Sequence, residues 1–266
     1  MNTQFITSPD GARIAYDVTG RGPFLMLLHG AGKDRRDWHK LGYVERLKQE
    51  YTVISVDIRG SGESDFLVDI SDYGIEKICA DVIAVADACN AGQFAIWGYS
   101  FGGNIARYLG AWSDRLTAIA VIGVPFGPAV DQQFDRFIAD FVKKWGGVAE
   151  AYQKDQLSVG KRQSAIKGRI PVWVACFQAM RGWPAIDPDA VRCPAMLLVG
   201  TQNISTLQWV TSHHAMLEQA NVCVEIVEGL NHPQEFTRVD LVFPAVSIFS
   251  RDTPNEQEGA GKQKRR

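Results

Sequence analysis

Residues 94–103 read F-A-I-W-G-Y-S-F-G-G, in which Gly98, Ser100 and Gly102 form a G-x-S-x-G pattern. An apolar, strand-like run precedes the serine and a helix-like run follows it, so the pattern marks a sharp strand-to-helix turn. Such a turn lifts the serine Oγ clear of the backbone, and the flanking glycines remove Cβ atoms that would collide there. The following helix points its N-terminal N–H groups at the same place, which suits developing negative charge. The pattern predicts Ser100 as a nucleophile; the alternative is a plain glycine-rich connection.

A serine nucleophile requires a base that takes its proton and donors that receive the oxyanion. Residues 27–32, L-L-H-G-A-G, end a predicted strand in a glycine-rich turn. We expect the backbone N–H of Ala31 and that of Phe101 to form the oxyanion hole, with His29 packed beneath the loop. His232 follows the last predicted strand and comes after the serine in the chain, so it is the candidate general base. The alternative for His232 is a loop histidine in solvent.

Composition limits the class of protein. The 266 residues are 46% hydrophobic and 22% charged with a net charge of −2, which fits one globular domain with a large core. This balance gives no reason to expect nucleic acid or an anionic membrane as a partner. No secretory signal and no bilayer-length apolar run is visible, so we expect a soluble, cytoplasmic protein that acts on a small molecule. The sequence does not indicate its oligomeric state.

Metal and disulfide chemistry are not expected. The five cysteines are scattered and contain no C-x-x-C pair, which argues against a disulfide framework or a zinc site. His213 and His214 are adjacent, so on a helix their side chains diverge and do not easily hold one ion. We therefore expect both histidines on a solvated helix surface, and we expect no cofactor.

Apolar runs alternate with helical patterns, which predicts an α/β fold with a largely parallel sheet. The predicted strands are residues 3–7, 12–18, 24–28, 52–57, 93–97, 117–123, 195–199 and 222–227. The predicted helices are residues 38–49, 72–89, 103–111, 206–219 and 238–249. The turn sequence Pro9-Asp10-Gly11 predicts that the first two strands form an antiparallel hairpin.

The segment 126–192 departs from this rhythm because it is rich in aromatic and helical residues and too long for a plain connection. We predict that it forms a helical cap, some of whose aromatic side chains line a pocket at the carboxyl edge of the sheet. Residues 1–125 and 193–250 then make up the core. Residues 251–266 are poor in apolar side chains and end in K-Q-K-R-R, which predicts a disordered tail.

Several motifs in this order resemble the α/β-hydrolase superfamily, and the resemblance covers about residues 6–249. Besides H-G at 29–30 and G-Y-S-F-G-G at 98–103, the segment 57–64, D-I-R-G-S-G-E-S, looks like the family's D-x-R-G-x-G-x-S turn. The resemblance implies an eight-stranded, mostly parallel sheet with an antiparallel second strand and a cap inserted after the sixth strand.

The resemblance also implies roles for single residues. It carries over Ser100 as nucleophile, His232 as general base, and Ala31 and Phe101 as oxyanion donors. In the turn at 57–64, it implies that Asp57, Arg59 and Ser64 are loop-bracing residues.

One position departs from the family pattern. The family's G-x-x-D after the seventh strand falls at residues 200–203, where the acid is replaced by Asn203. The acid normally holds the histidine tautomer and stabilises the imidazolium as it forms. Asn203 could accept from Nδ1–H through its carbonyl and give a slow triad of Ser100, His232 and Asn203. Alternatively the acid comes from elsewhere, with Asp131 as the nearest candidate after the sixth strand, or the protein binds a ligand without turnover.

The sequence therefore predicts a cofactor-free serine hydrolase that cleaves a small, fairly apolar carboxylic ester or related acyl compound through an acyl-enzyme. A C–C bond hydrolase, a lactonase or a cofactor-free perhydrolase would share the same site. A ligand-binding member of the fold is the alternative that involves no catalysis.

Overall fold

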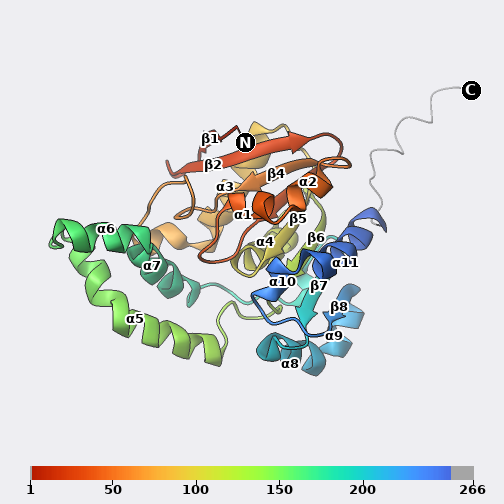
Figure 1. Ribbon diagram of the computed structural model, residues 1–266. Coiled ribbons are helices and arrows are strands. Elements are labelled where there is room, and N and C mark those ends of the chain that lie inside the picture. The colour runs from red at the N-terminus through yellow and green to blue at the C-terminus, as the bar shows by residue number, and fades with distance from the viewer. Residues whose placement is uncertain (1, 253–266) are drawn as a thin grey trace, which may run out of the picture.

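The computed structural model describes residues 2–252, and its centre is an eight-stranded sheet (Figure 1). The strand order is β1-β2-β4-β3-β5-β6-β7-β8. The strands are β1 (Gln4–Thr7), β2 (Arg13–Gly20), β3 (Phe24–Leu28), β4 (Thr52–Val56), β5 (Phe94–Tyr99), β6 (Leu116–Ile122), β7 (Ala195–Gly200) and β8 (Val222–Val227). Strand β2 is antiparallel to both neighbours and the pairs from β4 to β8 are parallel, so the predicted fold class is confirmed.

The predicted N-terminal hairpin is also present. Strands β1 and β2 pair antiparallel with Gln4 opposite Tyr16. The turn between them closes through the N–H of Gly11, which donates to the carbonyl of Ser8 at 2.9 Å. The Pro-Asp-Gly signal thus acts as the turn chemistry predicts.

Both faces of the sheet are covered, which explains why the central strands are apolar throughout. In β3, Met26 and Leu28 join the core under α3 (Ile75–Ala88) and α4 (Phe101–Trp112). Leu25 and Leu27 point to the other face. The helices that cover this second face are α1 (Arg35–Lys40), α2 (Tyr43–Leu47) and α11 (Val239–Asp252). Alternate side chains of one strand therefore enter two separate cores.

Two of the predicted helices are broken. The predicted helix 38–49 is divided into α1 and α2 because Gly42 adopts φ +81°, which an α-helix does not allow. The predicted helix 206–219 is divided at His213 into α8 (Ile204–Ser212) and α9 (His214–Gln219). The His213 ring stacks on Trp209 at 4.3 Å between centroids, so the prediction of a solvated surface position was wrong for this residue. His214 is exposed beside Glu218.

Three helices stand between β6 and β7, in the segment predicted as a cap (Figure 1). They are α5 (Gln132–Gln153), α6 (Val159–Lys167) and α7 (Ile170–Met180), followed by the short 3₁₀ helix η2 (Pro188–Ala190). Helix α7 packs on α5 and on the 3₁₀ helix η1 (Ile70–Tyr73) of the core. The fully buried Arg107 of α4 donates to the carbonyls of Pro125 and Gly127, which fixes the start of this segment.

The predicted tail 251–266 lies outside the described residues, apart from its first two positions, which end α11. Within residues 2–252, none of the helices combines the length and the hydrophobicity that a membrane crossing needs.

The close contact between α4 and β3 gives a first testable prediction. A Cβ at Gly102 would overlap the carbonyl oxygen of Leu28, so Gly102→Ala forces the helix away from the strand. We expect this variant to lose about 1–3 kcal/mol of unfolding free energy in urea, the usual cost of overpacking. Gly147→Ala in α5 is the matched control because a Cβ there meets no atom within 4 Å. The unfolding free energy of the control should rise by up to about 1 kcal/mol. An equal change in unfolding free energy in both variants would contradict the packing argument.

Candidate active site

Ser100 lies at the turn between β5 and α4 with φ 52° and ψ −110°, a conformation that L-residues rarely adopt. Its backbone N–H donates to the carbonyl of Ile122 in β6 at 2.8 Å. The first turn of α4 is held by the N–H of Gly102, which donates to the carbonyl of His29 at 3.0 Å. Neighbouring strands therefore hold the strained residue in place, as the motif predicts.

The imidazole of His232 meets the serine. The His232 Nε2 atom is 2.9 Å from Ser100 Oγ, although 131 residues separate the two positions in the chain. Tyr99 positions the histidine loop because its hydroxyl donates to the His232 carbonyl at 2.9 Å and its ring stacks on the imidazole. Phe236 stacks on the other side of the Tyr99 ring at 4.7 Å between centroids. The serine and histidine predicted from the sequence are thus brought together.

The carboxylate at this site belongs to Glu235, which the sequence analysis did not single out. Glu235 is fully buried in α10 (Gln234–Thr237), and its Oε2 is 2.9 Å from His232 Nδ1. Its Oε1 accepts from the N–H of Gly200 at 2.7 Å. A carboxylate there accepts from Nδ1–H and leaves the Nε2 lone pair directed at Ser100.

Asn203 is also at the site, but its contact differs from the one expected. Its amide nitrogen, not its carbonyl, faces the centre and lies 3.0 Å from both carboxylate oxygens of Glu235. The same nitrogen donates to the Gly123 carbonyl at 3.0 Å and is 3.3 Å from His232 Nδ1. A carboxylate accepts hydrogen bonds but donates none, so the NH₂ group of Asn203, and not its carbonyl oxygen, faces Glu235. Asn203 therefore contacts the Glu235 carboxylate through its NH₂ group.

Asp131, the alternative acid from the sequence, does not contact the histidine. It is the N-cap of α5, where its side chain accepts from the N–H of Phe134 at 2.7 Å. This capping contact is the ordinary use of an aspartate before a helix. The carboxylate at His232 Nδ1 thus belongs to a third position, Glu235.

Gly123, which follows β6, leaves room for the side chains of Glu235 and His232 because it has no Cβ. It has φ +81°, and a Cβ there would lie 2.9 Å from His232 Nδ1 and overlap Glu235 Oε2. The close approach of the backbone lets its carbonyl accept from Asn203. Any larger residue would displace the carboxylate from the imidazole.

A signal for Glu235 exists in the sequence. His232 and Glu235 are three residues apart in H-P-Q-E, and side chains at this spacing lie on one side of a helical turn. The pattern was overlooked because the resemblance directs attention to position 203. Spacing alone, however, does not show that this turn is buried with the glutamate pointing inward.

The loop after β3 and the start of α4 each bring one backbone donor to the serine. The N–H groups of Ala31 and Phe101 make no backbone hydrogen bond among the described residues, and both residues line the cavity beside Ser100. His29 is fully buried beneath this loop, as expected, with Nδ1 2.9 Å from the Gly30 carbonyl. Its Nε2 accepts from the N–H of Ile58 at 3.1 Å, so Nδ1 carries the proton, and burial lowers the pKa of His29. A neutral imidazole therefore joins the loops after β3 and β4.

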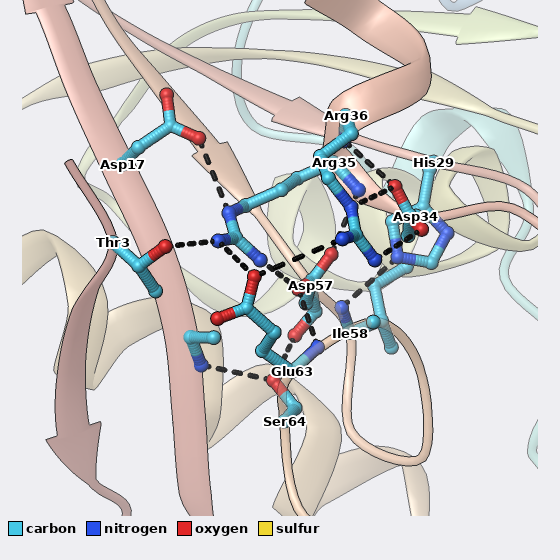
Figure 2. A network of polar contacts seen from close by, with 12 residues as sticks. Thr3, Asp17, His29, Asp34, Arg35, Arg36, Asp57, Ile58, Glu63 and Ser64 are labelled. Atoms are coloured by element: carbon cyan, nitrogen blue, oxygen red, sulfur yellow. Dashed lines mark hydrogen bonds and ion pairs between the residues drawn. The ribbon is translucent and has the colours of Figure 1, made fainter. Parts of the chain in front are cut away.

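A buried ion network holds the same loop from below (Figure 2). The side chain of Arg35 is 1% exposed and pairs with the carboxylates of Asp17, Asp57 and Glu63. Asp57 also accepts from the N–H groups of Arg35 and Glu63, at 2.7 and 2.8 Å. Ser64 donates to the Asp57 carbonyl at 2.6 Å, which closes the turn at 57–64. These contacts fix the loop that presents Ala31.

Arg59, the other residue of this turn, contacts carboxylates of α3 and of the turn between β1 and β2, and not the loop after β3. It is buried, with Nε 2.6 Å from Asp81 and a terminal nitrogen 2.8 Å from Asp10. The turn at 57–64 thus has the bracing role that the resemblance implies.

A cavity of about 670 Å³ opens at Ser100 and His232. Its walls are mostly apolar and come from the core and from the inserted helices. The aromatic and methionine side chains that reach it are Phe134 and Phe137 of α5 and Phe177 and Met180 of α7. Trp173 and Trp183 instead pack on the Phe101 ring. The volume lies within the usual range for small-molecule sites.

Comparison with known proteins agrees with this geometry. A family model described as alpha/beta hydrolase fold matches residues 23–165. The bifunctional epoxide hydrolase 2 of Sus scrofa is 27% identical over 130 residues, which are 47% of this chain and 22% of that protein. A pyrrolizixenacetamide deacetylase of Xenorhabdus hominickii is 32% identical over 105 residues, 38% of this chain and 36% of that protein. These matches span about a fifth to a third of the relatives' own length.

Among solved structures, a thermophilic esterase from Thermogutta terrifontis is similar over nearly the whole length. The TM-score is 0.74 at 22% sequence identity, and the match covers 96% of this chain and 100% of the esterase chain. At this identity the likeness shows a shared fold.

The ion network in Figure 2 generates a prediction about stability. Arg35→Met leaves the buried carboxylates of Asp17 and Asp57 without their cation, so we expect a loss of about 3–5 kcal/mol in unfolding free energy. Arg13→Met is the matched control because Arg13 and Asp65 form an exposed pair with nitrogen and oxygen 3.7 Å apart. The control should lose less than about 1 kcal/mol in the same urea titration. Similar losses in both variants would mean that the network does not stabilise the fold.

Proposed function

The chain belongs to the alpha/beta hydrolase family, and from this premise we propose that it is a serine hydrolase. Its substrate is a small, fairly apolar carboxylic ester or related acyl compound, cleaved through an acyl-enzyme. The observation that carries the proposal is the continuous chain of contacts Ser100–His232–Glu235, with 2.9 Å at each step. Ser100 and His232 line a largely apolar cavity whose volume suits a small-molecule substrate.

In the proposed acylation step, Ser100 Oγ attacks the carbonyl carbon while His232 Nε2 takes its proton. The carbonyl oxygen becomes an oxyanion, which the N–H groups of Ala31 and Phe101 stabilise. The imidazolium then gives its proton to the leaving alcohol, and the acyl group stays on the serine. Water, deprotonated by His232, attacks the acyl-enzyme, releases the carboxylic acid and restores Ser100.

We assign the role of the triad acid to Glu235. Its negative charge stabilises the imidazolium, which the neutral amide at position 203 does not. Asn203 then acts as a positioning residue, because its NH₂ group contacts both carboxylate oxygens. Such a donor satisfies the acceptor oxygens of a carboxylate that is fully buried.

Some relatives are named as epoxide hydrolases, but the nucleophile argues against that reaction here. Attack of Ser100 Oγ on an epoxide carbon would open the ring and leave an ether on the serine. An ether lacks the carbonyl at which water attacks an acyl-enzyme, so the enzyme would stop after one turnover. An ester, by contrast, gives an intermediate that the same histidine hydrolyses. The serine therefore favours acyl substrates.

The proposal predicts that Ser100→Ala lowers kcat for p-nitrophenyl butyrate by at least about 10³-fold, because no acyl-enzyme forms. A fluorophosphonate probe should label the wild type and leave this variant unlabelled. Ser164→Ala, an exposed position on α6, is the control and should match the wild type in both assays. Equal hydrolysis by Ser100→Ala would remove this serine from the reaction, and wild-type protein that neither labels nor hydrolyses would favour the ligand-binding alternative.

The assignment of the acid predicts an exchange experiment. Glu235→Gln keeps the shape but loses the charge, so kcat should fall by about 10⁴-fold, as for an Asp→Asn change in a serine-protease triad. Asn203→Asp alone places a second carboxylate beside the first, and mutual repulsion should lower both stability and activity. The double variant Asn203→Asp/Glu235→Gln returns one charge to the pair and should recover at least about tenfold over Glu235→Gln. Full activity in Glu235→Gln would show that another group supports His232.

A further inference from the structure

A second cavity, smaller than the first, lies beside the loop that presents Ala31. Its volume is about 180 Å³, and we call it the basic cavity because Lys33, Arg36, Lys167 and Arg169 line it. Its walls come from the loop after β3, the turn at 57–64 and the connection between α6 and α7. The volume is below the roughly 300–1,000 Å³ of pockets that hold drug-sized ligands, so only a compact group fits.

The charges around the basic cavity do not balance. Its four cations face a single lining carboxylate, Asp34, which is engaged by Arg36 through contacts of 2.9 and 3.2 Å (Figure 2). Within residues 2–252, Lys33, Lys167 and Arg169 have no carboxylate at ion-pair distance. Lys167 and Arg169 thus line one small space without an ion-paired carboxylate, whereas the Lys33 ammonium lies 5.8 Å from the centroid of the Phe236 ring.

Arg169 is fixed in place by carbonyl oxygens. Its two terminal nitrogens donate to the carbonyls of Gly60 and Gly62, the latter at 2.6 Å. A guanidinium has five N–H donors, so three remain after these two bonds. Burial lowers the pKa of Arg169, and the charges of Asp57 and Asp34 offset this shift only in part. The side chain is therefore held in advance for a further acceptor.

Ser61 adds a neutral residue to the lining of the basic cavity. It is 2% exposed and belongs to the wall that the turn at 57–64 supplies. A serine hydroxyl carries one O–H donor, so Ser61 offers a neutral donor beside the cations.

We propose that the basic cavity binds a compact oxyanion of the phosphate class. A phosphoryl group offers several acceptor oxygens and up to two negative charges, which match the Arg and Lys donors and the Ser61 hydroxyl. A carboxylate would leave more of these donors without an acceptor. Lys167, Arg169 and Ser61 line the basic cavity and not the cavity at Ser100.

The position of the basic cavity connects it with the hydrolase site. Gly32 and Lys33 line it and directly follow Ala31, and Lys33 also lines the larger cavity. A bound phosphoryl group would therefore hold the oxyanion loop from the outside. The group is either a free ion or part of a substrate whose ester lies at Ser100; this connection rests on the proposed function, whereas binding itself does not.

Calorimetric titration with inorganic phosphate tests the proposal on the full chain, at ionic strength held constant with sodium chloride. The wild type should show saturable binding at one site. Lys167→Met should bind at least about tenfold more weakly, since a charge-assisted hydrogen bond is lost. Lys161→Met is the matched control, because this lysine is exposed on the same helix and lines neither cavity; it should bind like the wild type.

Absence of saturable binding to the wild type would overturn the proposal, and so would equal affinity in all three proteins or an equal loss in both variants. Kinetics then identify the source of the ion. If phosphate changes kcat or KM for the neutral p-nitrophenyl butyrate, and Lys167→Met abolishes the change, the ligand is a free ion. If the neutral ester is unaffected but a p-nitrophenyl ester whose acyl chain ends in a phosphate is the better substrate, the ligand is a substrate group. Because calorimetry does not depend on turnover, a failed serine mechanism leaves the binding result intact.

Discussion

The structure depends on one strained residue, Ser100, whose backbone is held at φ 52° and ψ −110°. Such a conformation costs about 1–3 kcal/mol and persists only where the surroundings enforce it. Strand β6 enforces it through the bond from the Ser100 N–H, and the loop after β3 does so through the bond from the Gly102 N–H. The glycine at 102 lets helix and strand approach closely enough for both bonds to form. The other groups of the site are placed relative to this turn.

Parallel strands explain how residues distant in sequence meet at the serine. The carboxyl ends of neighbouring strands lie at one edge of the sheet, so the segments after β3, β5, β6, β7 and β8 gather there. These segments supply the backbone N–H of Ala31 after β3, the serine and the N–H of Phe101 after β5, and the carbonyl of Gly123 after β6. Asn203 follows β7, and His232 and Glu235 follow β8. The inserted helices then add the apolar wall of the cavity.

Buried charge is used in two different ways around this edge. Glu235 and Arg35 are both enclosed, and each is surrounded by partners that satisfy its hydrogen-bonding groups. Such groups are tolerated in a protein interior only when they are paired in this way. Arg169 differs, because carbonyl oxygens hold it without cancelling its charge. Carbonyl oxygens hold Arg107 in the same way, but Arg107 is fully buried, whereas Arg169 lines a cavity.

The sequence by itself determined the fold class, the antiparallel second strand that the resemblance implies and the turn at Ser100, because local patterns, glycine positions and motifs carry them. It also placed His232 after the last strand and close to the serine. Tertiary structure decided which group meets Nδ1 of His232: the contact depends on the burial of α10 and on the space at Gly123, neither of which spacing reveals. It likewise decided which aromatic side chains reach the cavity and brought the loop at 33–36 beside residues 167–169, since packing between distant segments has no local signature.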